Sequence, residues 1–196
     1  MGRRDRSKRG LTLAEVAVAS AVMIFVTFAS TTLLVAGLAS QSSQLNQSDL
    51  QRDAAGVLSR LSDELSESDP ASFRIDSAPQ GVVFASPRDA LGRFSYATDG
   101  SLMWGGYICY YVDTVNGTPS VVRTWSPLGT PVSGAPAVPV GMTTAWFHLR
   151  PLARRTVGTH VSSFTITGSN PLLISLTVSL QGRHSLSAST RVFLRN

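Results

Sequence analysis

The sequence has one cysteine, few acidic residues and no charge across a long N-terminal stretch. A single cysteine among 196 residues, Cys109, excludes an intrachain disulfide and a metal site built on several thiolates. Cys109 lies in the apolar run 107–112, so we predict a packing residue rather than a reactive thiol. The chain length fits one globular domain plus one membrane segment.

The motifs of common enzyme classes are also missing. The sequence contains no Gly-x-Ser-x-Gly, His-Glu-x-x-His, Cys-x-x-Cys or phosphate-binding glycine loop. The three histidines stand singly, without an acidic residue at a spacing typical of a triad or a metal set: His148, His160 and His184. Aspartates in the predicted loops do not form the dense run of oxygen ligands that calcium takes. We therefore predict a protein that is not an enzyme and carries no cofactor or metal.

The basic excess belongs to the first ten residues. Residues 1–10 hold five of the 17 basic residues and one of the 12 acidic residues. The rest of the chain has 12 basic residues against 11 acidic ones, so its net charge is +1 rather than the +5 of the whole. The high pI therefore does not indicate a nucleic-acid partner. Basic residues before an apolar span instead hold that end in the cytoplasm, which predicts an extracytoplasmic C-terminal domain.

An uncharged apolar segment follows the basic head. Residues 16–39 contain neither charge nor proline, and 24 helical residues exceed the roughly 30 Å of a bilayer core. The segment predicts a membrane-spanning helix within 11–39. A secretory signal peptide cut near Ala39 is an alternative that leaves an exported domain from Ser40 onward. A plain signal anchor, with the nearby acid Glu15 incidental, is another.

The pattern predicts that the helix continues through residues 40–69. Apolar residues recur there on a helical period, with a mostly polar opposite face that includes Glu64. Asp69-Pro70 is the expected stop, because a residue before proline disfavours the helical conformation. An isolated helix over about 11–68 has no reason to be stable in water, so we expect its outer half to pack on a folded domain. The stripe that makes this contact is Leu45, Leu50, Ala54, Val57, Leu58, Leu61 and Leu65.

Residues 70–196 predict a globular antiparallel β domain packed on the helix, which makes the fold class α+β. The clearest strands alternate apolar and polar residues over 172–180 and 186–194, with a turn at 181–184. Asn116-Gly117 predicts a hairpin between strands at 107–112 and 121–125. Shorter strands are expected at 82–85, 93–96, 146–149 and 161–167. Proline and glycine make 128–140 an expected exposed loop.

The N-terminus resembles that of type IV prepilins and of the pseudopilins of type II secretion systems. In that family a short basic leader ends in Gly, and Glu is the fifth mature residue; Gly10, Leu11 and Glu15 stand in those places. Weaker features resemble the J-type minor pseudopilins: the leucine-spaced stretch 58–65, a Gly-Ser-Leu-x-Trp patch at 100–104 before an aromatic hairpin, and the last strand at 192–196.

The resemblance implies a minor pilin or pseudopilin in a filament for type II secretion, a type IV pilus or a competence pilus. It implies cleavage of leader 1–10 between Gly10 and Leu11, then N-methylation of Leu11, by a prepilin peptidase/methylase. Glu15 would pair with the new amino group of a neighbouring subunit, and Thr12 would cap the helix start. The implied partners are other pilin or pseudopilin subunits, an inner-membrane assembly platform and membrane lipid, with a single-pass location in the inner membrane.

Two other interpretations stay open. In the first, the chain is a binding module on an uncut signal anchor, and Glu15 only reaches water near the interface. In the second, it is an exported protein cut near Ala39 with an unrecognised hydrolase site.

Overall fold

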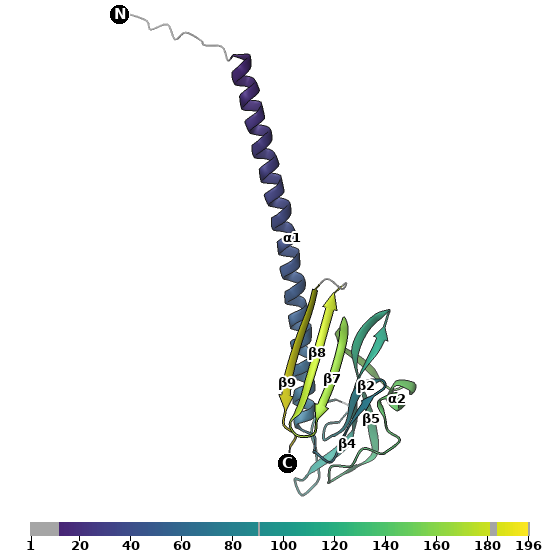
Figure 1. Ribbon diagram of the computed structural model, residues 1–196. Coiled ribbons are helices and arrows are strands. Elements are labelled where there is room, and N and C mark those ends of the chain that lie inside the picture. Colours follow the sequence, from purple (N-terminus) through teal and green to yellow (C-terminus); the bar gives the residue numbers. More distant parts are fainter. Residues whose placement is uncertain (1–11, 90, 181–183, 196) are drawn as a thin grey trace, which may run out of the picture. The chain divides into compact units, whose positions relative to one another are not determined.

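The computed structural model describes residues 12–89, 91–180 and 184–195 and shows an α+β chain (Figure 1). Two compact units, Met1–Leu45 and Asn46–Asn196, divide it. The first element, helix α1 (Leu13–Ser66), contributes to both units and is followed by two antiparallel sheets.

Helix α1 has 54 residues and is long and apolar enough near the N-terminus to cross a membrane. It contains no proline, and it ends three residues before Asp69-Pro70. The Ser68 amide closes its last turn by donating to the Leu65 carbonyl at 2.9 Å. The predicted helix is therefore confirmed over most of its length, with ends two residues inside those expected.

The larger sheet has the order β1-β2-β4-β5-β6, and the two-residue β3 also pairs with β4. Its strands are β1 (Phe73–Ser77), β2 (Gln80–Ser86), β3 (Ser95–Tyr96), β4 (Leu102–Val115), β5 (Thr118–Val132) and β6 (Arg154–Thr159). Asn116 and Gly117 join β4 to β5 with φ of 51° and 78°, the left-handed conformation that a two-residue hairpin turn requires. This confirms the predicted hairpin.

The smaller sheet has the order β7-β8-β9, made by β7 (Val161–Gly168), β8 (Leu172–Leu180) and β9 (His184–Val192). Along β8, Ile174, Leu176 and Val178 are buried while Ser175 and Thr177 are partly exposed, so the predicted alternation is confirmed. The expected turn at 181–184 lies outside the described residues except for His184, which begins β9.

Two apolar cores lie on opposite faces of the larger sheet. The first core joins the part of α1 after Asn46 to both sheets, with Leu61 and Leu65 fully buried beside Phe84 and Phe164. Gly158 of β6 is part of this contact, because a side chain there would collide with Val57 of α1. The predicted stripe is buried except for Leu45, which is 60% exposed.

The second core lies under α2 (Thr144–Leu149) and the chain before it. Here two expectations are wrong. Residues 146–149 form a helix rather than a strand, because the Thr143 hydroxyl caps the Trp146 amide and the Thr144 amide donates to Asp76 at 2.7 Å. Residues 128–132 are not loop but the end of β5, and Ala135 and Val138 after them pack on the second core.

Three smaller differences concern strand number and length. Strands β1 and β6 have no counterpart among the expected strands, and only Ser95–Tyr96 of the expected strand 93–96 forms. Both missed strands carry charged residues, Arg74 and Asp76 in β1 and Arg154 and Arg155 in β6, which interrupt an apolar pattern.

Candidate functional site

Thr12 and Glu15 form a reciprocal cap at the start of α1. The Thr12 amide and hydroxyl donate to Glu15 Oε2 at 2.8 and 3.0 Å, and the Glu15 amide donates to the Thr12 hydroxyl at 3.3 Å. This arrangement satisfies two of the amide groups that a helix leaves unpaired at its N-terminus. It also fixes where the carboxylate of Glu15 lies relative to its own helix.

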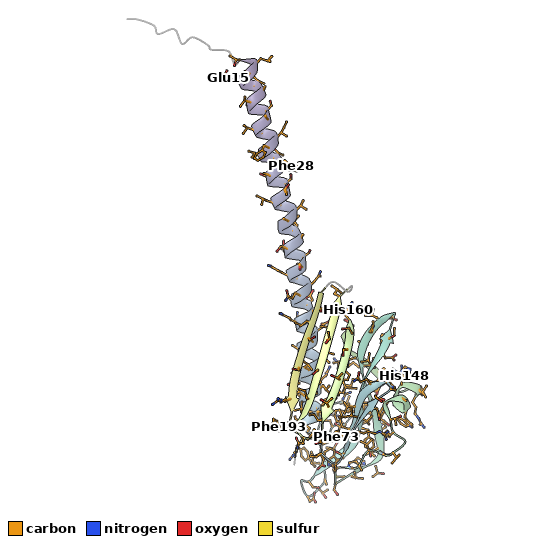
Figure 2. All side chains as sticks on the ribbon, viewed as in Figure 1. Glu15, Phe28, Phe73, His148, His160 and Phe193 are labelled. Atoms are coloured by element: carbon orange, nitrogen blue, oxygen red, sulfur yellow. The ribbon has the colours of Figure 1, made fainter. Side chains whose placement is uncertain are left out.

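Glu15 is the only charged residue between Thr12 and Ser48. The helix beyond it is apolar and exposed: Phe25, Phe28 and Leu33 are more than 70% accessible. Figure 2 shows Glu15 and Phe28 on this helix. The hydroxyls of this stretch are bonded within the helix, as Ser20 to the Val16 carbonyl and Thr27 to the Met23 carbonyl, both at 2.8 Å. Such internal pairing suits a helix in lipid, where no water is present to bond polar groups.

Small side chains lie next to Glu15. Ala19 and Ser20 sit about one turn further along α1 and line, with Glu15, a shallow hollow in the helix surface. Small residues let a second helix approach closely within a membrane. The start of α1 therefore combines a carboxylate with small side chains one turn away. Gly10 and Leu11, the residues of the expected cleavage and methylation, lie outside the described residues.

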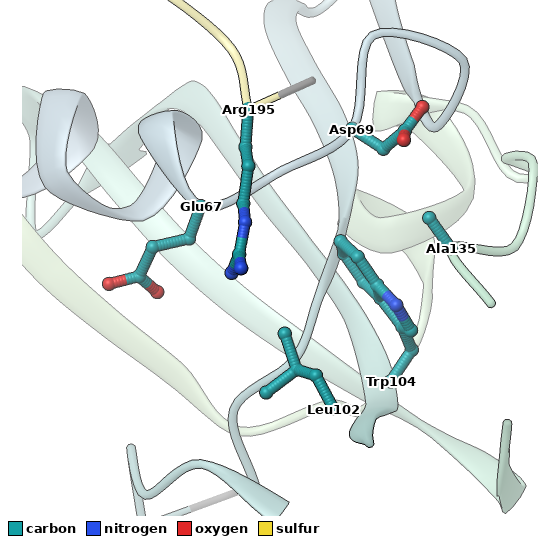
Figure 3. A pocket seen from close by; sticks show the side chains of 6 residues that line it. All are labelled: Glu67, Asp69, Leu102, Trp104, Ala135 and Arg195. Atoms are coloured by element: carbon teal, nitrogen blue, oxygen red, sulfur yellow. The ribbon is translucent and has the colours of Figure 1, made fainter. Parts of the chain in front are cut away.

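A cavity of about 180 Å³ is present in the second unit (Figure 3). It is lined by Glu67, Asp69, Leu102, Trp104, Ala135 and Arg195. Its acids already have partners: Glu67 forms an ion pair with Arg88, whose Nε donates at 2.7 Å, and Asp69 accepts the Ala71 amide at 2.7 Å. These contacts tie the carboxylates to structural roles.

His148 is not isolated, in contrast to the sequence-based interpretation. Its Nδ1 lies 3.3 Å from Asp113 Oδ2, and Arg154 Nη1 lies 3.3 Å from the same oxygen. The three residues come from α2, β4 and β6, so no local spacing reveals them. The cluster fastens α2 to the larger sheet.

Asp89 and Asp99 shape their own turns. Asp89 accepts the Arg93 and Leu91 amides at 2.9 Å, and the first of these bonds is the main cause of its lowered pKa. Asp99 accepts the Ser101 amide at 2.9 Å, and bonding to Ser101 lowers its pKa. Across residues 12–89, 91–180 and 184–195, no three metal-ligating side chains gather at one point.

The most important polar contact that the sequence did not reveal joins α1 to the larger sheet. Arg123 Nε of β5 lies 2.9 Å from Glu64 Oε2, and the Tyr110 hydroxyl donates to the same oxygen at 3.0 Å. Glu64 is only 14% exposed, although we expected it on the polar face of the helix. A single acid beside an apolar stripe gives no sequence signal for this role.

Comparison with protein families, curated proteins and solved structures finds no match to this chain.

Proposed function

We propose that this chain is a minor pilin or pseudopilin, a non-enzymatic subunit of a filament anchored in the inner membrane. One observation carries the proposal: Glu15 is the single charge in residues 12–48, the exposed N-terminal part of a long helix that follows a basic segment. A charge within a membrane helix costs about 2.5–3.5 kcal/mol on insertion scales, so it implies a partner. The filament serves type II secretion, a type IV pilus or a competence pilus.

The partner of Glu15 is an amino group made by processing. A prepilin peptidase/methylase cuts between Gly10 and Leu11 and methylates Leu11, which creates a cation four residues before the acid. A carboxylate accepts several hydrogen bonds, so Glu15 can keep its bonds to Thr12 while it receives a neighbour's amine. Pairing in low dielectric removes much of the penalty of the buried charge.

The same features support a location and further partners. The basic residues 3–9 hold the N-terminus in the cytoplasm, and one helix crosses the membrane, so the unit Asn46–Asn196 lies outside. The exposed apolar side chains of α1 lie against lipid before assembly and against other pilin or pseudopilin helices afterwards. An inner-membrane assembly platform is the remaining partner.

The test separates the charge of Glu15 from its capping role. Glu15→Gln keeps an oxygen that can accept the Thr12 bonds but has no charge, whereas Thr12→Ala weakens the cap and keeps the charge. We expect both variants to be cleaved after Gly10. We expect co-purification with partner pilins to fall at least about tenfold in Glu15→Gln, equivalent to ~1.4 kcal/mol of lost pairing, and to change little in Thr12→Ala.

Intact-mass analysis of the protein extracted from membranes completes the test. A mature, methylated Leu11 supports the proposal. An uncut Met1 favours the signal-anchored binding domain, and a start at Ser40 favours the exported domain. Normal co-purification of Glu15→Gln would show that the pairing role is wrong even if cleavage occurs.

A further inference from the structure

Strand β9 forms an edge of the smaller sheet and has few of the features that usually prevent another strand from pairing there. It has nine residues without proline, and Arg191 is its only Lys, Arg, Asp or Glu. The other sheet edges differ: β1 has five residues and contains Arg74 and Asp76, and β6 begins with Arg154-Arg155. The opposite edge of the smaller sheet, β7, contacts β2 and β5. Proteins usually protect free edges with charge, proline or short length, and β9 has little of this protection.

The hydrogen-bonding groups on this edge follow from the register. The Ser179 amide of β8 donates toward β7, to the His160 carbonyl at 2.7 Å. Backbone groups alternate sides along a strand, so the odd-numbered residues of β8 face β7 and the even-numbered ones face β9. Odd residues of β8 lie opposite odd residues of β9. The N–H and C=O groups of Ser185, Ser187, Ser189 and Arg191 therefore point outward, and no described strand pairs with them.

The side chains beside this edge are short and uncharged. Ser185, Ser187 and Ser189 are exposed on one face, where the Ser187 and Thr177 hydroxyls lie 2.9 Å apart. Leu186 and Ala188 on the other face are half-buried against the first core. A strand added at β9 would extend both faces if it placed apolar side chains beside Leu186 and Ala188 and small polar ones beside the serines.

We propose that the free edge of β9 binds an extended segment of a different protein, which adds a fourth strand to the smaller sheet. Its backbone pairs with the four outward-facing residues, and its side chains alternate between apolar and small, uncharged polar. Main-chain pairing gives such complexes their affinity, and the alternating side chains give specificity.

Geometry excludes a second copy of β9 as this strand. Residues 46–66 of α1 run alongside the smaller sheet (Figure 1). Antiparallel pairing of two β9 strands would make residues 46–66 of the two copies run in opposite directions, which does not suit two chains that leave one membrane; this step alone rests on the proposed function. For two β9 strands to pair in parallel through the same edge, one sheet must be turned over about its strand direction. Its serine-bearing face would then lie beside the apolar face of the other sheet.

The test uses the full chain in mild detergent and a labelled synthetic peptide with the sequence HSLSASTRV, whose central residues SLSAS have the required alternation. Ser187→Pro removes one outward N–H and no backbone bond to β8, although it also loses the hydroxyl contact with Thr177, and we expect it to weaken peptide binding at least tenfold. Ser187→Ala, the matched control, removes the hydroxyl but keeps the N–H, and it should bind as the unaltered chain does.

Hydrogen–deuterium exchange on the unaltered chain gives a readout that needs no variant. The peptide should slow exchange of the amides of residues 185, 187, 189 and 191, which the free protein leaves unpaired. Equal binding by Ser187→Pro, or no change in exchange at these amides, would overturn the proposal. Self-association lost in Ser187→Pro would also overturn it, because a second copy would then be the occupant. None of these readouts depends on Glu15 or on cleavage after Gly10.

Discussion

Cys109 shows how burial changes the chemistry of a single residue. It lies in β4 with no exposed surface, as the apolar run 107–112 predicts. Burial raises the pKa of its thiol far above the ordinary value, and the nearby Asp76 carboxylate adds to the shift. The thiolate is the reactive form of cysteine, so native Cys109 should be inert toward alkylating reagents until the domain unfolds.

The same shift predicts a loss of stability in alkali. Above a pH of about 8.5 the thiol ionises in the unfolded chain but stays protonated in the native one, so the unfolded state binds fewer protons. The free energy of unfolding should then fall by up to ~1.4 kcal/mol per pH unit. Above a pH of about 10 two buried tyrosines add to the fall, because burial raises the pKa of Tyr111 to about 12 and that of Tyr110 further. Urea titrations at several pH values measure the slope.

Cys109→Ala is the control for this prediction. It should remove the slope between pH values of about 8.5 and 10 while it leaves the later contribution of Tyr110 and Tyr111 in place. An unchanged slope in Cys109→Ala would show that another group causes the alkaline loss.

At the scale of elements, the sequence predicts best where one face of an element is uniformly apolar. The stripe from Leu50 to Leu65 and the alternation in β8 both gave the correct buried face, because water is excluded from one side of each. Residues 146–149 gave the wrong element, because the cap by Thr143 and the bond from Thr144 to Asp76 decide it. Asp76 is far away in sequence, so no local pattern contains this contact.

Glu64 tests how the outer part of α1 is held on the larger sheet. Glu64→Ala leaves the guanidinium of Arg123, 19% exposed, without its carboxylate and the Tyr110 hydroxyl without its acceptor. We expect a loss of about 2–3 kcal/mol in the free energy of unfolding, typical of breaking a largely buried charged hydrogen bond. The neighbouring Asp63→Ala, at an exposed position, should change it by less than ~0.5 kcal/mol. Equal effects of the two variants in urea titrations would contradict this account.

At the scale of the whole molecule, the sequence predicted an apolar helix and an antiparallel β domain, and both are present. The carboxylate of Glu15 could be found from the sequence, because a lone charge in an uncharged segment is conspicuous. The free edge of β9 could not be found from the sequence, because the sequence does not show which strand lies at the edge of the sheet. Strand order follows from contacts between distant residues, such as those of β7 with β2 and β5.

The division into two units makes a prediction about folding. Every buried apolar residue of the described chain lies between Leu50 and Leu194, and the first 45 residues contribute none of them. A fragment of residues 46–196 should therefore fold as a soluble protein with one cooperative unfolding transition, measured by circular dichroism. The fragment lacks only residues 1–45, whose described part exposes a large apolar surface. Because the full chain keeps that surface, it should require detergent.

A shorter fragment of residues 59–196 is the matched comparison. It lacks Leu50, Ala54, Val57 and Leu58, four residues of the first core. Removing a buried leucine side chain alone costs about 2–5 kcal/mol, so the loss of two leucines and their neighbours approaches the whole stability of a domain. We expect this fragment to be unfolded or aggregated. If 46–196 also failed to fold, the N-terminal part of α1 would be needed for the domain, and the two units would not be independent.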